Sequence, residues 1–332
     1  MKIAFFWTWE FSANILAWIL TYNSPPARGE MAESQRGVEV LLTVSQPDKP
    51  FWRKQELMPT KVKEFSLSKW LNILQPEKLK NNQEFLDHLK SLDLDFIVVV
   101  AYGKIIPTSI LEIPKYWCIN IHWSILPSYR WASPIQESIK NWDKKTGLTI
   151  MYMSAWMDEW DILAIEEVEI GILDKTPEIF KKFENIWVDL LINTLNWVID
   201  WKIKWQKQDD SKATYCKKIE KEMWKIDFEK ENLLQIYNKF KAFYPWPWVF
   251  TNYEWKKFQI TDLYFEENDL FFDEDFNLWD VVEFEDHGQN NIWILCKWWI
   301  LILKKVKLEW KKEMDIFSFV NGNKKFLEYN FL

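Results

Sequence analysis

Glycine is scarce in this chain, and that scarcity restricts where its backbone can turn. The 332 residues include only 7 glycines but 24 tryptophans, whereas glycine usually makes up about 7% of a soluble protein. Tight turns favour the residue that has no Cβ atom, and an indole side chain is the least suited to replace it. The tryptophans nevertheless stand at expected turns and strand ends, namely Trp7, Trp9, Trp123, Trp131, Trp156, Trp160, Trp255, Trp298 and Trp299.

We interpret most of these tryptophans as positions that are glycine in the cellular protein. Some genetic codes read the codon UGA as tryptophan and others read it as glycine, so translation with the wrong code would make this exchange. Restoring 23 of the 24 positions gives 30 glycines, about 9% of the chain, which is close to the usual share. The alternative is a genuinely Trp-rich protein, in which the indoles should follow core faces with a period of 2 or 3.6 residues.

Length and composition indicate a two-domain cytoplasmic protein. Cys118, Cys216 and Cys296 lie far apart with no CxxC pair and no histidine at metal-ligand spacing, so we expect free thiols and no bound metal. The N-terminus lacks the regions of a signal peptide, and the apolar run 96–101 is too short to cross a bilayer. The net charge of −7 disfavours a general nucleic-acid binder without excluding local basic patches. We expect a monomer without a membrane partner.

The first two thirds of the chain alternate strand and helix patterns. The predicted strands cover residues 2–6, 38–44, 73–74, 96–101, 117–122, 147–153 and 162–170. The predicted helices cover residues 11–22, 61–71, 82–92, 107–111, 133–141 and 176–199, and polar loops cover 23–37 and 46–61. Such alternation is typical of the α/β class, with a doubly wound and mostly parallel sheet between two helix layers.

The last third has a different pattern. One helix over 232–243 is followed by strands that begin at 249 and continue over 257–264, 281–284, 292–297 and 300–308. Short strands separated by polar turns predict a small OB-like β-barrel. We therefore divide the chain into an α/β domain over 1–204, a linker over 205–228 and a barrel domain over 229–332.

The residue types that can carry chemistry concentrate at the ends of two neighbouring strands. Asn120 and His122 are two residues apart, so they share one face of a strand. Asp158 follows the next strand. In open parallel sheets, ligands bind beyond the carboxyl ends of the strands. An amide can donate to an oxyanion, an imidazole can move protons and a carboxylate can orient the imidazole, which suits transfer of an acyl or formyl group to an amine.

A family resemblance appears when tryptophan is replaced by glycine. The altered segments read FFGTGEFS, SQPDKPFGRKQELMP, VVVAYGKIIP, CINIHGSILPSYRGASPIQ, MSAGMDEGDIL, ATYCKKIEKEMGKIDF and FYPWPGVFT. Along nearly the whole chain these segments resemble the methionyl-tRNA formyltransferase family, and the first half resembles folate-dependent formyltransferases in general. Trp246, in YPWP, is the one position at which the family itself has tryptophan.

The resemblance implies roles for individual residues. Asn120, His122 and Asp158 match the catalytic trio. Two segments match the binding site for the co-substrate 10-formyltetrahydrofolate, namely Ser124, Ile125, Leu126 and Pro127, and Val100, Ala101, Tyr102, Gly103 and Ile105. The segment 46–63 matches the loop that approaches the tRNA acceptor end, with Lys49, Arg53, Lys54 and Lys61 as the contacts. The C-terminal barrel matches the domain that binds the initiator methionyl-tRNA by phosphate contacts.

Three alternatives stay open on the sequence. One is another 10-formyltetrahydrofolate-dependent transferase or hydrolase, which acts on an amino sugar or releases formate. The second is a nucleotide-binding oxidoreductase, although residues 5–10 lack the third glycine of GxGxxG. The third is a non-catalytic RNA-binding relative, which becomes favoured if the tryptophans are genuine and Trp123 and Trp131 crowd the site.

Overall fold

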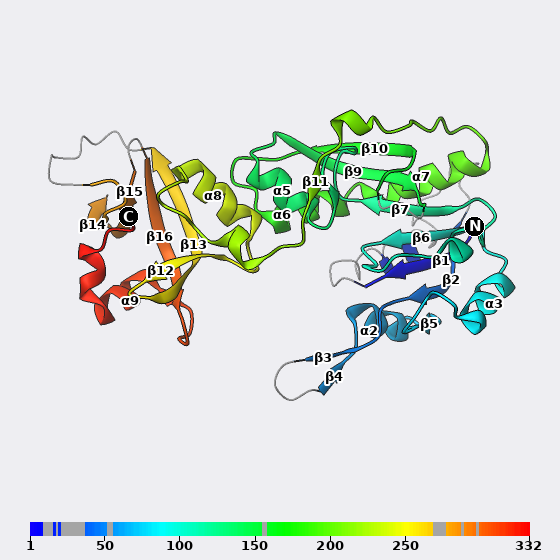
Figure 1. Cartoon of the computed structure of the whole chain (residues 1–332), viewed down its shortest axis with the longest axis horizontal. Coiled ribbons are helices and arrows are strands. Elements are labelled where there is room, and N and C mark those ends of the chain that lie inside the picture. The colour runs from blue at the N-terminus through cyan, green and yellow to red at the C-terminus, as the bar shows by residue number, and fades with distance from the viewer. Residues whose placement is uncertain are drawn as a thin grey trace, which may run out of the picture. The chain divides into compact units, whose positions relative to one another are not determined.

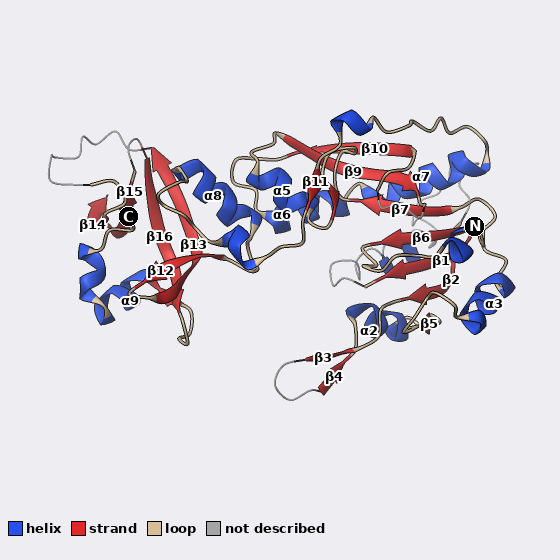
Figure 2. Cartoon of the chain, viewed as in Figure 1, coloured by secondary structure: helices blue, strands red, loops and turns tan. Residues whose placement is uncertain are grey.

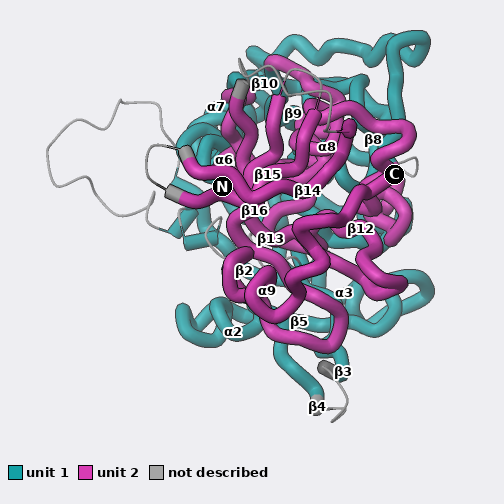
Figure 3. The backbone as a smooth tube through the Cα atoms, turned by 90° about the vertical axis from the view of Figure 1, so that its left-hand side faces the viewer, with its two compact units in different colours: residues 1–134, 145–169, 181–216 teal, residues 135–144, 170–180, 217–332 magenta. Residues whose placement is uncertain are grey.

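A computed structural model of the chain describes residues 1–8, 16–17, 19–20, 37–51, 56–154, 158–267, 277–286, 289–296 and 299–332 (Figure 1). The chain forms two compact units (Figure 3). Unit 1 comprises Met1–Pro134, Lys145–Glu169 and Lys181–Cys216, and unit 2 comprises Ile135–Lys144, Ile170–Phe180 and Lys217–Leu332. Most of the predicted helix 11–22 and nearly all of the predicted loop 23–37 lie outside the described residues.

Unit 1 is built on a seven-stranded sheet in the order β10-β9-β7-β6-β1-β2-β5. The strands are β1 (Lys2–Trp7), β2 (Glu39–Val44), β5 (Ile73–Leu74), β6 (Phe96–Val100), β7 (Cys118–His122), β9 (Lys145–Tyr152) and β10 (Ile162–Glu169). The five strands from β7 to β5 are parallel, while β9 runs antiparallel to both β7 and β10. The strand order reverses between β1 and β6, which makes this point of the sheet the topological switch point.

Both faces of this sheet are buried, which explains the continuous apolar runs of β1 and β6. Successive side chains of a strand point to opposite faces. Phe6 packs in the same cluster as Phe85 of α3 (Gln83–Ser91) and Ile110 of α4 (Thr108–Leu111). Phe5 on the opposite face is also fully buried. Helix α7 (Trp187–Ile199) contacts β9 and β10. The predicted doubly wound, mostly parallel α/β class is confirmed.

Two segments differ from the sequence prediction. The single helix expected over 176–199 is two helices, α6 (Thr176–Glu184) and α7, because Asn185 and Ile186 donate to carbonyls only three residues back and tighten the turn. Apolar spacing continues across this break and therefore does not reveal it. The loop expected over 46–61 contains a hairpin of β3 (Lys49–Phe51) and β4 (Glu56–Met58), which extends away from the sheet (Figure 1).

The remaining elements of the middle of the chain are short. Helix α2 (Lys61–Ser68) begins where the Thr60 hydroxyl accepts a hydrogen bond from the Lys63 backbone N–H, a normal N-cap. The other elements are β8 (Arg130–Trp131), α5 (Pro134–Lys140), β11 (Tyr215–Cys216) and 3-10 helices at Asp210–Lys212 and Lys221–Trp224. Strands β8 and β11 form a parallel two-stranded ladder.

Unit 2 contains an antiparallel sheet in the order β12-β13-β16-β15-β14, with β17 paired to β16 (Figure 2). Its elements are α8 (Leu233–Ala242), β12 (Val249–Tyr253), β13 (Lys256–Glu267), β14 (Val281–Asp286), β15 (Gln289–Leu295), β16 (Trp299–Leu308), β17 (Met314–Asp315), α9 (Ile316–Gly322) and a 3-10 helix at Lys324–Glu328. The predicted series of strands after one helix is confirmed as a separate antiparallel sheet. The unit is not all-β after that helix, because α9 and the last 3-10 helix are elements that the sequence did not predict.

Nine tryptophans among the described residues have a left-handed backbone, with φ between 56° and 116°. They are Trp70, Trp117, Trp131, Trp142, Trp201, Trp248, Trp255, Trp279 and Trp310. Residues with a Cβ atom pay roughly 1–2 kcal/mol in this region, whereas glycine does not. The backbone therefore favours glycine at these nine positions, which include Trp131 and Trp255 from the predicted turns. Of the other tryptophans named there, the described ones, Trp7, Trp123, Trp160 and Trp299, are not in this group.

Candidate functional site

The three predicted catalytic residues lie together in unit 1. Asn120 and His122 lie on β7, which the parallel ladder with β6 places inside the sheet. The Asn120 Nδ2 atom is 3.5 Å from Asp158 Oδ1, and the His122 Nδ1 atom is 3.6 Å from Asp158 Oδ2. The His122 and Asp158 side chains are only 6% and 12% exposed. Residues 38 positions apart in the chain thus form one polar cluster in a largely buried setting.

The hydrogen bonds of His122 fix the position of one of its protons. The Nε2 atom lies 2.8 Å from the Tyr129 backbone carbonyl. A carbonyl oxygen only accepts hydrogen bonds, so Nε2 carries a hydrogen. The second ring nitrogen, Nδ1, then faces the Asp158 carboxylate. In the imidazolium form, one N–H points toward the Tyr129 carbonyl and the other points toward Asp158 Oδ2. This arrangement suits a group that holds and releases a proton at Nδ1.

Asp158 is itself held by backbone groups. Its Oδ2 atom accepts a 2.9 Å hydrogen bond from the Trp131 backbone N–H. Its own backbone is left-handed, with a φ of 60°, a conformation that aspartate tolerates better than most residues. The carboxylate therefore faces His122 from a turn whose geometry is unusual and fixed by its neighbours.

The predicted loop 124–127 follows β7 directly and is tied to β9. The Thr149 hydroxyl donates to the Ser124 carbonyl over 2.6 Å and accepts from the Leu126 backbone N–H over 3.1 Å. The Ser124 hydroxyl donates to the Ser128 carbonyl over 2.6 Å. Ser124 and Leu126 are buried, whereas Ile125 and Pro127 are partly exposed. These bonds make the loop a fixed wall at the end of β7.

The predicted segment 100–105 leaves β6 at the switch point of the sheet. The Tyr102 carbonyl accepts hydrogen bonds from the Thr8 hydroxyl over 3.0 Å and from the Gln46 amide over 2.7 Å. Thr8 follows β1, and Gln46 follows β2. A Cβ atom on Gly103 would lie only 2.8 Å from Gln46 Nε2, and the φ of Gly103 is 75°, so the position favours glycine. Burial raises the pKa of the Tyr102 hydroxyl to about 12.

Sequence reasoning did not assign Thr8 or Gln46 to the site. Both stood inside segments that carry the family resemblance, FFGTGEFS and SQPDKP. Their position at the carboxyl ends of adjacent parallel strands was the signal that could have found them. Their hydrogen bonds to Tyr102 hold the segment 100–105 from the β1 and β2 side of the switch point.

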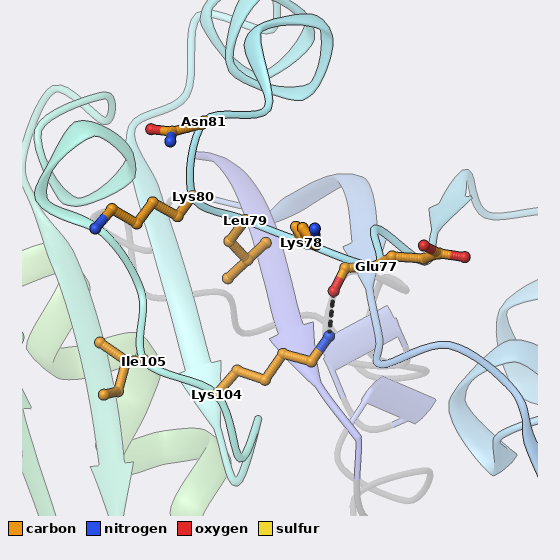
Figure 4. Close-up of a pocket in the computed structure, with 7 residues that line it drawn as sticks. All are labelled: Glu77, Lys78, Leu79, Lys80, Asn81, Lys104 and Ile105. Carbon is orange, nitrogen blue, oxygen red and sulfur yellow. Dashed lines mark hydrogen bonds between the residues drawn. The ribbon is translucent and has the colours of Figure 1, made fainter.

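A pocket of about 380 Å³ opens next to the same segment (Figure 4). It is lined by residues 77–81 together with Lys104 and Ile105. The Lys104 ammonium donates to the Glu77 carbonyl over 2.9 Å, which links the segment to the loop after β5. Ile105 is 71% exposed, so the end of the segment offers an apolar contact at the protein surface.

Two of the predicted basic contacts are described, one on the β3–β4 hairpin and one just after it. Lys49 is exposed on β3, and Lys61 at the start of α2 pairs with Glu64 over 3.0 Å. Arg53 and Lys54 lie outside the described residues. Although burial opposes it, hydrogen bonds from Lys63 and Gln75 lower the pKa of Asp48 at the base of the hairpin. The ion pair between Asp48 and Lys63 is 2.5 Å long.

Metal-ligand clusters and membrane-spanning helices are absent from the described residues. In those residues, no three or more His, Cys, Asp and Glu side chains cluster in a way that could hold a metal ion. Cys118, Cys216 and Cys296 are buried, and none of them forms a disulfide bond. None of the helices within the described ranges has both the length and the apolar content needed to span a membrane.

Comparison with known proteins identifies the family. The formyl transferase family matches residues 26–195, and the C-terminal domain family of formyl transferases matches residues 218–324. The methionyl-tRNA formyltransferase of Caldicellulosiruptor saccharolyticus is 40% identical over 326 residues, which cover 98% of this chain and 97% of the relative. The chain belongs to the methionyl-tRNA formyltransferase family. The methionyl-tRNA formyltransferase of Clostridium tetani is 35% identical over 324 residues and covers 98% and 97% of the two chains.

Solved structures agree on the fold. An N-formyltransferase from Helicobacter canadensis in complex with folinic acid and dTDP-3-aminofucose has a TM-score of 0.59 at 15% identity and covers 91% of this chain and 98% of its own. HypX from Aquifex aeolicus in complex with tetrahydrofolic acid has a TM-score of 0.55 at 15% identity, over 79% and 44% of the two chains. As a member of the methionyl-tRNA formyltransferase family, the chain is a formyl-transferring enzyme, and the oxidoreductase alternative is removed.

Proposed function

We propose that Asn120, His122 and Asp158 transfer the formyl group of 10-formyltetrahydrofolate to the α-amino group of initiator methionyl-tRNA. The observation that carries this proposal is the cluster itself. One Asp158 oxygen lies 3.5 Å from the Asn120 amide, and the other lies 3.6 Å from His122 Nδ1. Relatives at 40% and 35% identity over nearly the full length support the same acceptor. The formylated product serves translation initiation.

The three side chains divide the chemistry between them. As the amine nitrogen bonds to the formyl carbon, negative charge develops on the formyl oxygen. The Asn120 amide donates a hydrogen bond to this oxygen, and the positive charge of protonated His122 stabilises it. The new C–N bond forms while the bond from the formyl carbon to the folate nitrogen breaks. The amine gives up one proton and the folate nitrogen takes one, and His122 with Asp158 carries protons between them. Asp158 keeps the imidazole oriented throughout.

The fit of the folate co-substrate rests on the two segments at the sheet edge. The segment containing Val100, Ala101, Tyr102, Gly103 and Ile105 leaves the sheet ladder at the switch point, where its peptide groups can read the edges of a pterin ring. The loop of Ser124, Ile125, Leu126 and Pro127 lies beyond the adjacent strand. Fixed backbone groups and partly exposed apolar side chains are the usual lining of such a site. Neither contact requires a metal.

The basic residues Lys49, Arg53, Lys54 and Lys61 are proposed contacts of the tRNA acceptor end. An exposed hairpin with lysines at its base suits phosphate recognition, which depends on charge rather than on base sequence. The all-β unit is proposed to bind the body of the tRNA. The proposed boundaries are 1–204 for the catalytic domain, 205–228 for the linker and 229–332 for the tRNA-binding barrel, in a cytoplasmic monomer.

A formylation assay tests the acceptor. Purified protein is incubated with 10-formyltetrahydrofolate and either charged initiator methionyl-tRNA, an amino-sugar nucleotide or water alone. We expect formyl-methionyl-tRNA as the main product. Formylation of the sugar, or release of formate without an acceptor, would instead support the other folate-dependent alternative. Binding of the folate without any turnover would support the non-catalytic alternative.

We also propose that most of the tryptophans are glycines in the cell through UGA recoding. The nine left-handed tryptophans support this proposal. So do the buried indole nitrogens of Trp187 and Trp293, which have no hydrogen-bond acceptor among the described residues. The intact mass of the protein from its native source tests it. A mass lower by one Trp-to-Gly difference for each recoded position is expected, and the mass of the printed sequence would contradict it.

A further inference from the structure

The amide of Gln208 holds the turn that carries Asp158. Its Nε2 atom donates to the Asp158 carbonyl over 2.9 Å and to the Trp160 carbonyl over 2.7 Å. An amide nitrogen has two hydrogens, so both are used on this turn. Gln208 is only 6% exposed. The turn includes the left-handed Asp158, whose backbone conformation costs energy and needs support from its surroundings.

A buried arginine fixes the orientation of that amide. The Arg130 Nε and Nη2 atoms donate to Gln208 Oε1 over 3.2 Å and 2.9 Å. A guanidinium only donates, so the amide oxygen must face it and the amide nitrogen must face the turn. Arg130 is 1% exposed, and its charge is paired with Asp210 over 2.6 Å. The Tyr215 hydroxyl accepts from Nη1 over 3.3 Å.

The three consecutive residues Tyr129–Trp131, with Arg130 in the middle, contact both His122 and Asp158. Tyr129 gives its carbonyl to His122, and Trp131 gives its backbone N–H to Asp158. Arg130, between them, donates from its side chain to the Gln208 amide oxygen, and the Gln208 amide nitrogen donates to the Asp158 carbonyl. Trp131 and Trp160 take part in these hydrogen bonds through backbone atoms only. The same hydrogen bonds can therefore form whether these residues are tryptophan or glycine.

We propose that Gln208 and Arg130 are positioning residues that set the place of the Asp158 carboxylate relative to His122. This inference rests on the proposed function. Without the amide, the carbonyls of Asp158 and Trp160 lose their donors and the turn relaxes. The carboxylate then moves away from Nδ1, and displacements of about 1 Å in a catalytic group can reduce the rate by about 100-fold.

The substitution Gln208→Glu tests the proposal because it keeps the shape and the acceptor for Arg130 but turns an oxygen toward two carbonyls. We expect kcat for formylation to fall about 10- to 100-fold, with the KM values for folate and tRNA within about twofold of their original values. Arg130→Lys keeps the charge beside Asp210 but loses the paired N–H groups, and we expect a loss of similar size. If Gln208→Glu does not fold, Arg130→Lys provides the test.

A double-mutant comparison with Asp158 distinguishes a positioning role of Gln208 from a general structural role. In an Asp158→Asn background, Gln208→Glu should lower kcat by less than about threefold, because residues that act through one group are non-additive. Multiplicative losses would overturn the proposal. Thr194→Val is the matched control, since it removes the 2.6 Å hydrogen bond from the hydroxyl of buried Thr194 to the Leu190 carbonyl elsewhere in unit 1. An equal loss of kcat in this control would also overturn it.

The two proposals fail in different ways. If Asp158→Asn has the original turnover, the catalytic assignment fails. If Asp158→Asn is slow but both Gln208→Glu and Arg130→Lys keep the original turnover, only the positioning role fails.

Discussion

The backbone N–H of Trp131 donates a 2.9 Å hydrogen bond to the carboxylate of Asp158. Trp131 has a φ of 83° and its side chain is 45% exposed, so the contact depends on a left-handed backbone and not on the indole. Glycine at this position would keep the bond and remove the strain of the Cβ atom. Trp131 therefore contacts Asp158 through its main chain.

Removal of either proton-handling side chain should abolish most of the turnover. We expect His122→Ala and Asp158→Ala each to lower kcat by at least about 100-fold, a usual general acid–base contribution. Steady-state formylation of methionyl-tRNA measures it. His88→Ala, on the exposed surface of α3, is the control and should be unchanged. A near-normal rate in either site variant would remove that residue from the mechanism.

Neutralising the hairpin should weaken the use of tRNA. We expect the double substitution Arg53→Ala and Lys54→Ala to raise the KM for methionyl-tRNA and to leave the KM for folate unchanged, because phosphate contacts depend on charge. The salt dependence of the KM should also become less steep. The control removes two exposed lysines elsewhere in unit 1, Lys90 and Lys115. An unchanged KM for tRNA would contradict the assignment.

Glycine should stabilise the turn between β12 and β13 in protein made with the printed sequence. Glu254 and Trp255 both have positive φ, 45° and 67°, and form the two-residue loop of the hairpin. Such loops favour glycine at the second position. We expect Trp255→Gly to raise the free energy of unfolding by about 1 kcal/mol. Urea denaturation measures it.

Alanine at the same position separates backbone strain from loss of the indole. Trp255 is fully exposed, so Trp255→Ala removes the ring but keeps the Cβ atom. We expect no gain in stability from alanine. Equal gains from both substitutions would show that the exposed ring, and not the backbone, is unfavourable.

Lys241 should make stability depend on pH above neutrality. Burial lowers the pKa of its ammonium from 10.5 to about 8, against an opposing effect of Asp174. Below pH 8, both the folded and the unfolded chain hold this proton. Between about pH 8 and 10.5, the unfolded chain binds more protons, so the free energy of unfolding rises with pH by at most about 3 kcal/mol.

The variant Lys241→Met isolates this effect, because other groups titrate equally in both proteins. We expect Lys241→Met to be more stable than the parent at pH 7 and to lose that advantage by pH 9.5. Urea unfolding at the two pH values measures the difference. A difference that does not change with pH would show that the burial of Lys241 does not control its protonation.

The sequence by itself determined the fold class and predicted the trio of Asn120, His122 and Asp158. The apolar runs of β1 and β6 require two covered faces, and the spacing of Asn120 and His122 puts both on one face of a strand. These features are local, so they can be read from neighbouring residues. The sequence did not predict the break between α6 and α7, because the apolar pattern continues across the tightened turn.

Only the tertiary structure decided how the site is held. Gln208 and Arg130 are 78 residues apart in the chain, and their contact depends on the pairing of β8 with β11 and on the burial of the guanidinium. The bracing of Tyr102 by Thr8 and Gln46 arises because parallel strands distant in sequence end at the same edge of the sheet. Hydrogen bonds between such distant residues leave no periodic pattern, since each is fixed only when the whole sheet has formed.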